Sequence, residues 1–102
     1  MTKRIELQSQ LEGILGSSSV WFQPPESVKL KYPVILYNFE GFHMIKNHDG
    51  IYKHMSRYTV KAIDKNPESL IGFNILNNFP YSSFDRRYIS DGMVHDVITL
   101  YF

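Results

Sequence analysis

The chain has 102 residues, of which 43% are hydrophobic and 15% aromatic, so it is long enough for one domain with an ordinary core and too apolar for an intrinsically disordered protein. Eleven basic and ten acidic residues leave a formal net charge of +1, which produces no strong overall field to attract nucleic acid. The absence of cysteine excludes disulfide bonds and thiolate metal sites, which fits a reducing compartment.

The N-terminal segment predicts a helix and shows no export signal. Residues 1–6 lack the apolar stretch of a signal peptide, and no apolar run approaches the ~18 to 20 residues of a membrane span. We therefore expect the protein to stay in the compartment where it is made, without a membrane partner. Apolar residues then recur at the spacing of one helical stripe, which predicts a helix over residues 3–15 that ends at Gly16. The stripe consists of Leu7, Leu11, Ile14 and Leu15.

A proline-containing arm is predicted after this helix. Residues 17–19 are three serines and indicate a loop, and residues 20–22 indicate a short strand. Pro24 and Pro25 cannot donate a backbone hydrogen bond, so regular sheet pairing is interrupted there. Residues 23–32 are therefore expected to form an extended arm.

The middle of the chain predicts a strand followed by a long hairpin. Residues 34–39 are apolar on both faces, which is typical of a central strand, and Glu40 and Gly41 are expected to end it. Residues 42–55 form a mixed polar stretch around Asp49-Gly50, a strong turn signal that could join two ribbon-like strands.

A third strand and a second helix are predicted next. Residues 56–64 alternate between polar and apolar, as in a strand with one buried face. That face carries Tyr58, Val60 and Ala62. Asn66 is a suitable N-cap and Pro67 a suitable first helical residue, so a helix is expected over residues 67–77. Its expected inward stripe consists of Leu70, Phe73 and Leu76.

The last twenty-four residues predict a closing hairpin. A turn is expected at residues 90–92, which read Ser-Asp-Gly. One face of the second strand is expected to carry Val94, Ile98, Leu100 and Phe102. A strand that ends on large apolar side chains must be held by its own sheet or by a neighbouring subunit.

These elements predict a single domain over residues 1–102 of the α+β class. Two helices are expected to pack on one face of a mostly antiparallel sheet, with one long hairpin and an extended proline-containing arm.

The sequence carries no motif of an enzyme or of a cofactor site. The four histidines, at positions 43, 48, 54 and 95, lack metal-ligand spacing, so no metal site is expected. No serine lies in a Gly-x-Ser-x-Gly turn, and the isolated glycines form no phosphate-binding loop. We therefore expect no catalytic, cofactor-binding or metal-ligating residues, and a function that depends on the surface of the molecule.

Two local features rise above this background. Three prolines, at positions 24, 25 and 33, stiffen the stretch over residues 22–33 that contains the arm, which lowers the entropy lost when such a segment docks on a neighbour, although a plain strand connection has the same composition. Asp85 precedes Arg86 and Arg87 on a predicted strand. Adjacent arginines point to opposite faces of a strand, so one of them is expected to meet solvent or a partner. A surface ion pair with Asp85 is the alternative, and it would contribute little.

Four segments of the chain together resemble a family of tail terminator or tail completion proteins from the neck of tailed bacteriophages. In order, the segments are residues 22–33, 63–69, 79–86 and 92–102, which read FQPPESVKLKYP, IDKNPES, FPYSSFDR and GMVHDVITLYF. The similarity covers most of the chain in the same order. It departs between Glu40 and Met55, which leaves the function of that hairpin open.

This resemblance implies a structural virion protein without enzymatic activity. Similar proteins form rings, commonly sixfold, that cap the completed tail tube and dock on the connector of the head, while DNA passes through the lumen. The implied partners are further copies of the chain, the tail tube protein and a head completion or connector protein. The implied location is the virion neck, after assembly in the host cytoplasm. The candidate subunit-interface residues are Gln23, Pro24, Pro25, Lys29, Lys31, Tyr32, Asp85, Arg86, Leu100, Tyr101 and Phe102.

Two alternatives remain open from the sequence. A head completion or stopper protein of the same neck would need a segment able to plug the channel, and the hairpin over residues 42–55 could serve. A small nucleic-acid-binding module would stack bases on exposed aromatic side chains close to lysine or arginine. The aromatic candidates for such stacking are Tyr32, Tyr37, Phe39, Tyr58 and Tyr88.

Overall fold

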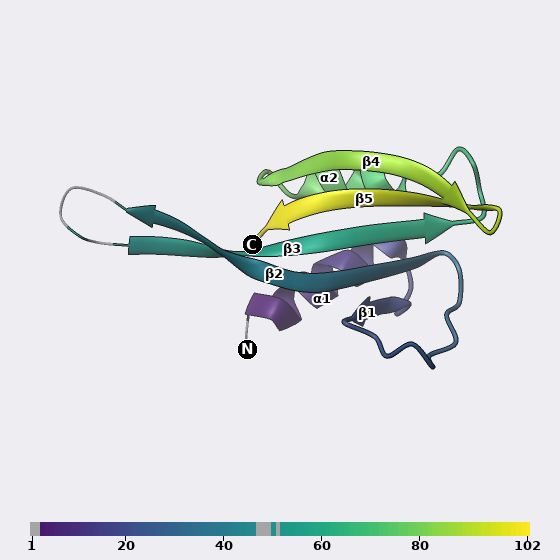
Figure 1. Ribbon diagram of the computed structural model, residues 1–102, viewed down its shortest axis with the longest axis horizontal. Helices are drawn as coiled ribbons and strands as arrows, with labels where there is room; N and C mark the ends of the chain where they lie inside the picture. Colours follow the sequence, from purple (N-terminus) through teal and green to yellow (C-terminus); the bar gives the residue numbers. More distant parts are fainter. Residues whose placement is uncertain (1–2, 47–49, 51) are drawn as a thin grey trace.

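The computed structural model describes residues 3–46, 50 and 52–102, which form two helices and a five-stranded sheet (Figure 1). The elements are α1 (Lys3–Leu15), β1 (Val20–Phe22), β2 (Val34–Lys46), β3 (Tyr52–Asp64), α2 (Ile71–Asn78), β4 (Ser82–Ser90) and β5 (Met93–Tyr101). The strand order is β1-β2-β3-β5-β4, and every neighbouring pair is antiparallel except β1 with β2. The predicted α+β class is confirmed.

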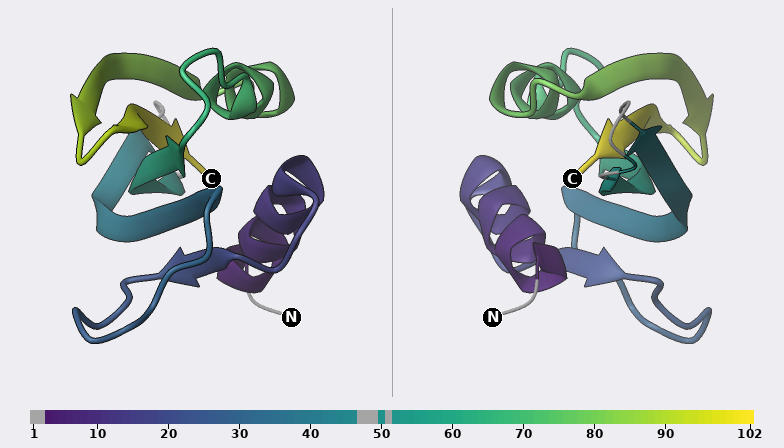
Figure 2. Two further views of the ribbon diagram at one scale, coloured as in Figure 1. Left: turned by 90° about the vertical axis from the view of Figure 1, so that its right-hand side faces the viewer. Right: turned by 90° about the vertical axis from the view of Figure 1, so that its left-hand side faces the viewer.

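Both helices lie on the same side of the twisted sheet, which we call the helix-side face (Figure 2). The core lies between the two layers and includes Leu7 and Leu11 of α1, Ile75 of α2, and Val60 and Ile98 of the central strands, all fully buried. Each such side chain stabilises the fold by about 1.5–3 kcal/mol relative to an exposed one. The opposite side of the sheet, the open face, has no helix over it among the described residues.

The prediction for α1 is confirmed in both its bounds and its buried stripe. The helix ends at Gly16, whose φ of 79° is a left-handed conformation that glycine adopts without strain, and whose N–H donates to the carbonyl of Glu12 at 2.8 Å. The side chain of Gln8 fixes the helix to the sheet. Its amide donates to the Val20 carbonyl at 2.8 Å, and its Oε1 accepts from the Tyr37 hydroxyl at 2.5 Å.

The predicted end of the central strand at Glu40 and Gly41 is wrong. The pairing with β3 shifts register between Phe39 and Gly41, which leaves Glu40 as the extra residue of a β-bulge, and β2 continues to Lys46. The bulge re-aims the strand without ending it, so β2 and β3 form the predicted long hairpin. Most of its predicted turn, residues 47–49, lies outside the described residues.

The second helix starts later than predicted and is rotated, so that two of its three predicted inward residues are exposed. Residues 66–69 form a turn in which Asn66 Oδ1 accepts from the Glu68 N–H at 3.0 Å, and α2 begins only at Ile71. Of the predicted inward residues, Leu70 and Phe73 are exposed, whereas Leu76 is half-buried and packs against the core as predicted. Gly72 and Ile75 are the buried residues of the helix. The reason for this orientation is the contact of Gly72 with β5, described below.

The closing hairpin is confirmed. Asp91 and Gly92 have φ values of 54° and 74°, as a two-residue hairpin turn requires, so β4 and β5 pair from Ser90 and Met93 onward. Every residue of β5 is buried or half-buried, and β3 and β4 flank this strand on both edges. The chain therefore ends on a strand held by its own sheet.

Candidate subunit interface

The β2–β3 hairpin extends beyond the rest of the sheet (Figure 1). The last residue of β5, Tyr101, pairs with Arg57, so the part of β3 before Arg57 has no β5 neighbour. β1 pairs with β2 only as far as Tyr37. The strand segments 42–46 and 52–55 therefore have no third strand beside them within the described chain. At the base of this ribbon, the Ser56 carbonyl accepts from the Phe102 N–H at 2.9 Å, and the His43 ring contacts that of Tyr101 at 5.3 Å between centroids. The molecule measures 51 Å along its longest axis against 25 and 23 Å across.

The helix-side face of this projecting ribbon carries three partly exposed apolar side chains, opposite Ser56 and His54. Phe39, Phe42 and Met44 share it, and we call these three residues the hairpin patch. The Phe42 side chain is 64% exposed and Met44 51%, although the Phe42 ring contacts those of Phe39 at 5.2 Å and His54 at 5.9 Å between centroids. A row of ring contacts thus leads from buried Tyr58 outward to exposed Phe42.

A second apolar surface lies at the other edge of the sheet. α2 and β4 enclose an open groove lined by Leu70, Phe73, Leu76 and Phe84, which we call the α2–β4 groove. Leu70 is 64% exposed and Phe73 57%. Large apolar side chains that line a groove and are this exposed to water are unusual for an isolated small domain and suggest a contact surface.

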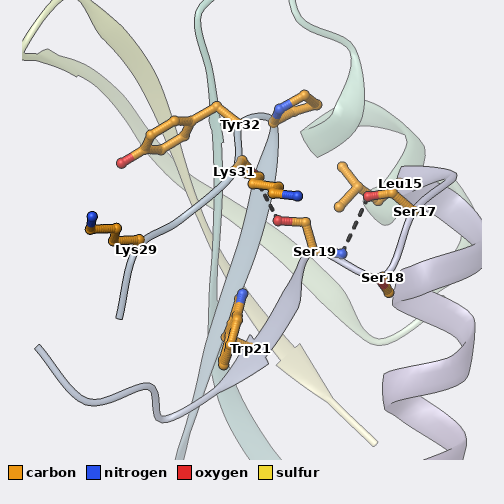
Figure 3. Close-up of a pocket in the computed structure, with 9 residues that line it drawn as sticks. Leu15, Ser17, Ser18, Ser19, Trp21, Lys29, Lys31 and Tyr32 are labelled. Atoms are coloured by element: carbon orange, nitrogen blue, oxygen red, sulfur yellow. Dashed lines mark hydrogen bonds between the residues drawn. The ribbon is translucent and has the colours of Figure 1, made fainter. Parts of the chain in front are cut away.

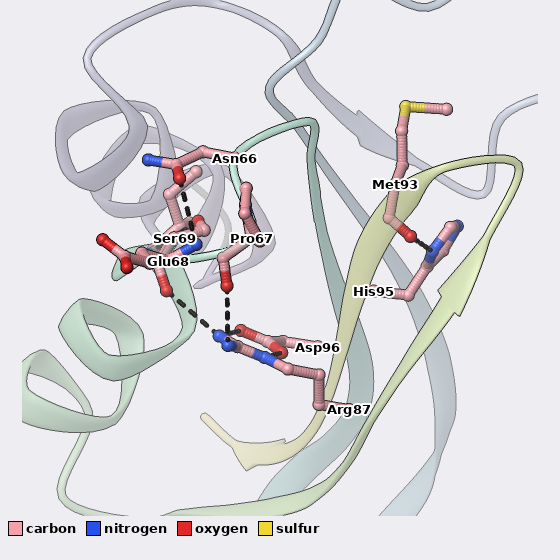
Figure 4. A network of polar contacts seen from close by, with 9 residues as sticks. Asn66, Pro67, Glu68, Ser69, Arg87, Met93, His95 and Asp96 are labelled. Atoms are coloured by element: carbon pink, nitrogen blue, oxygen red, sulfur yellow. Dashed lines mark hydrogen bonds and ion pairs between the residues drawn. The ribbon is translucent and has the colours of Figure 1, made fainter.

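An ion pair forms one wall of this groove (Figure 4). Asp96 on β5 is 2% exposed and accepts from Arg87 Nε at 2.6 Å and from Arg87 Nη2 at 2.9 Å. Arg87 also donates to the carbonyls of Pro67 and Ser69, at 3.4 and 3.0 Å. The bond to Asp96 raises the pKa of Arg87. One guanidinium therefore fixes the turn before α2 to the two C-terminal strands.

Gly72 determines which side of α2 faces β5. A Cβ on this residue would approach Asp96 Oδ2 to 2.6 Å, so only glycine lets the helix backbone lie so close to the carboxylate. Ile75 and Phe79 follow Gly72 on the same side of the segment and are buried. The consequence is that Leu70 and Phe73 face the groove.

The arm borders an open pocket of mixed polar and apolar lining (Figure 3). Lys29, Lys31 and Tyr32 lie on one side of it, and Trp21 and Ser19 on the other. Ser19 Oγ donates to the Lys31 carbonyl at 2.7 Å, which ties the arm to the loop after α1. Both lysines and Tyr32 are exposed, so this surface is basic and partly aromatic.

The two adjacent arginines point to opposite faces of β4, as predicted. Arg87 points to the helix-side face, whereas the Arg86 guanidinium on the open face lies 5.4 Å from the centre of the Tyr88 ring. Tyr88 in turn stacks on His95 with a centroid distance of 4.7 Å. The ion pair considered between Asp85 and an arginine is wrong, because Asp85 accepts from Thr99 Oγ1 at 2.7 Å and Arg87 binds Asp96.

The predicted interface residues fall on separate surfaces. The arm follows β1 at one edge of the sheet, and Asp85 and Arg86 lie on β4 at the other, so these two groups are not brought together. The exposed members are Gln23, Pro25, Lys29, Lys31, Tyr32, Asp85 and Arg86, and the partly buried members are Pro24, Tyr101 and Phe102. Leu100 is wrong as an interface residue, because it is fully buried in the core of its own chain.

Sequence reasoning missed the two apolar surfaces. Phe42 and Met44 alternate with polar residues, which is the strand signal that could have identified a one-sided ribbon. For the groove, the apolar residues of α2 surround most of the helix, so spacing alone could not show which of them lie outside. The aromatic set considered for stacking bases is also reduced, because Tyr37 and Tyr58 lie in the core.

Among residues 3–46, 50 and 52–102, no three His, Asp or Glu side chains gather so that they could hold a metal ion. None of the described helices has the length and apolar character needed to cross a membrane. Comparison with protein-family models, with curated proteins and with solved structures finds no match for this chain. Function is therefore inferred from the surfaces described above.

Proposed function

We propose that this protein is a structural subunit of the neck of a tailed bacteriophage, where copies assemble into a ring that caps the tail tube and docks it to the head connector. The observation that carries the proposal is the projecting β2–β3 hairpin with its exposed Phe42 and Met44. The resemblance of the four sequence segments to tail terminator proteins supplies the biological setting.

The hairpin supports assembly for a physical reason. A two-stranded ribbon is marginally stable in water unless a third strand or another packed element covers it. Within the described chain, segments 42–46 and 52–55 have no third strand beside them, and the contacts of His43 with Tyr101 and of Ser56 with Phe102 lie at the base of the ribbon. An adjoining subunit that packs on the ribbon would stabilise it and remove the hairpin patch from water.

The two edges of the sheet support a ring rather than a two-fold dimer. β1 and the basic arm form one edge, and β4 with the α2–β4 groove forms the other. Two unlike surfaces suit a heterologous contact, in which a patch on one copy meets a different patch on the next, and a closed rotation then yields a ring.

The charge distribution is compatible with a DNA conduit. By alternation along the strands, Arg57, Lys61 and Arg86 point to the open face of the sheet, while the net charge of the whole chain is only +1. A strongly cationic lumen would bind many phosphates and impede transit, whereas a few separated cations would not.

A stopper protein of the same neck is the second candidate, because a projecting hairpin can also reach into a channel. Deletion of the gene from the virus that encodes it separates the two. Loss of a terminator gives tails of uncontrolled length, whereas loss of a stopper gives tails of normal length that fail to join filled heads. Normal virions from the deletion strain would refute both assignments.

A biochemical test complements the genetic one. We expect size-exclusion chromatography with light scattering to show a ring-sized oligomer, alone or in the presence of purified tail tubes. Titration with a single-stranded oligonucleotide at low salt tests the remaining alternative, and tight, strongly salt-dependent binding by the monomer would favour a nucleic-acid-binding module.

A further inference from the structure

We infer that the hairpin patch of one copy packs into the α2–β4 groove of the next copy, so that these two surfaces form the junction between subunits. The inference rests on the ring proposed above and identifies the surfaces that build it. It assigns the groove as the site that receives the hairpin of another copy of the protein.

The two surfaces are complementary in form and in polarity. The hairpin patch is a row of three apolar side chains on a narrow projection. The groove is a recess between a helix and an edge strand, with the apolar side chains Leu70, Phe73, Leu76 and Phe84 on one part of its lining and the Arg87–Asp96 ion pair on another. Phe42, Met44, Leu70 and Phe73 are each more than half exposed, so both surfaces contact water in the isolated chain.

The hairpin cannot fill the groove of its own chain. It extends beyond the C-terminal end of β5, away from α2 and β4 (Figure 1). Its strands are continuous with the central strands of the sheet, which fixes their direction. Each copy therefore presents one unfilled groove and one unpacked projection, and a ring of copies satisfies both at every junction.

The apolar area involved suits a stable junction. With ~200 Å² for a fully exposed large side chain, the hairpin patch and the groove together expose on the order of 600 Å² of apolar surface. A standard protein interface buries about 1,600 Å² in total, of which somewhat over half is apolar. Contact of the two surfaces thus supplies most of the apolar part of such an interface.

Two charge substitutions test this pairing. Phe42→Glu removes the projection's central ring and Phe73→Glu places a charge in the groove, and neither disturbs the core because both side chains are largely exposed. Each variant alone should be monomeric under conditions in which the native chain forms rings. Mixed at equal amounts, they should give a one-to-one dimer and nothing larger, because only one intact projection can meet one intact groove. Ser9→Glu on the exposed side of α1 is the matched control, because this residue lies on none of the surfaces considered for the ring, and it should still form rings.

Cross-linking reports the same contact where association is weak. The chain has no cysteine, so Phe42→Cys and Phe73→Cys provide unique thiols. With a short bismaleimide, the mixture of the two variants should cross-link at least tenfold faster than either variant alone or than a mixture of Phe42→Cys with Ser9→Cys. Circular dichroism with thermal melting confirms that each variant is folded.

The outcomes separate the inference from the proposed function. If the native chain forms rings while Phe73→Glu also forms rings and the 42–73 cross-link is absent, the pairing is wrong and the ring stands. If Phe42→Glu and Phe73→Glu each abolish assembly but their mixture restores full rings, the contact is not hairpin to groove. If the native chain forms no oligomer with or without tail tubes, and no cross-link appears, both the inference and the proposed ring fail.

Discussion

The substitution Asp96→Ala should destabilise the protein more than any change to an exposed charge. The carboxylate is 2% exposed and accepts two hydrogen bonds from Arg87, at 2.6 and 2.9 Å. Its removal leaves the guanidinium with only the carbonyls of Pro67 and Ser69 as protein partners. It also opens a void against Gly72, whose backbone lies next to the carboxylate.

The expected loss is about 3 kcal/mol of unfolding free energy. Breaking one side of a buried ion pair costs about 3–5 kcal/mol, and the lower end applies here because the Arg87 side chain is 40% exposed and regains water. For a domain of this size, about 3 kcal/mol corresponds to a decrease in Tm of roughly 12–20 °C.

Urea denaturation followed by circular dichroism measures this loss. Asp85→Ala is the matched control, because Asp85 is exposed and bonds only Thr99, and it should cost less than about 1 kcal/mol. A double-mutant cycle with Arg87→Ala should give a coupling energy above about 1 kcal/mol. If Asp96→Ala loses less than about 1 kcal/mol, or if the cycle is additive, the ion pair does not hold the turn before α2 to the sheet.

Three further outcomes follow from the packing. Gly72→Ala should destabilise the protein by about 1–3 kcal/mol in urea melts, because the new Cβ would meet Asp96 Oδ2 at 2.6 Å. Gly13→Ala in α1, which has open space around it, should stabilise the protein by about 0.5–1 kcal/mol, and equal effects of the two changes would contradict the close approach of Gly72 to Asp96. Burial raises the pKa of Tyr37, so the contribution of its neutral phenol to stability is complete below about pH 10 and is lost as pH rises through the folded-state pKa. In thermal melts between about pH 9 and 11, Tyr37→Phe should therefore lose less Tm than the native protein, and identical curves would exclude this effect. Gln8→Ala removes the acceptor of the Tyr37 hydroxyl and the donor to Val20, and should lower the unfolding free energy by about 1–3 kcal/mol in the same assay, with exposed Gln10→Ala as the nearly neutral control.

Local sequence signals identified most elements of the fold. The stripe of Leu7 and Leu11 marks α1, and the alternation around Val60 marks β3. The Asp91-Gly92 turn sets the register of β4 with β5, because a two-residue loop with positive φ leaves only one way to pair the strands. Such signals work where neighbouring residues alone decide the backbone conformation.

The start of α2 shows where local signals fail. Asn66 and Pro67 fit a helix N-terminus, but they fit a turn equally well. A helix from Pro67 would need the carbonyls of Pro67 and Ser69 as acceptors in its own first turns. Arg87 on β4 donates to both carbonyls instead, and no pattern of neighbouring residues reveals a donor so far away in the sequence. A contact between residues about twenty positions apart thus sets the helix boundary.

The candidate interface depended even more on tertiary structure. The sequence identified the arm and the Asp85-Arg86 pair as surface features, and both are exposed. It also placed Leu100 at an interface, because a terminal apolar strand looks the same whether its own sheet or a neighbour covers it.

The sequence by itself determined the types of element, the antiparallel pairing and the one-sided core, because periodicity and turn residues act within a few positions. The tertiary structure decided which apolar side chains remain outside. The rotation of α2 follows from the space that Gly72 leaves for Asp96, and the projection of the hairpin follows from β5 ending opposite Arg57. Both depend on where distant segments meet, and periodicity along one segment carries no information about that.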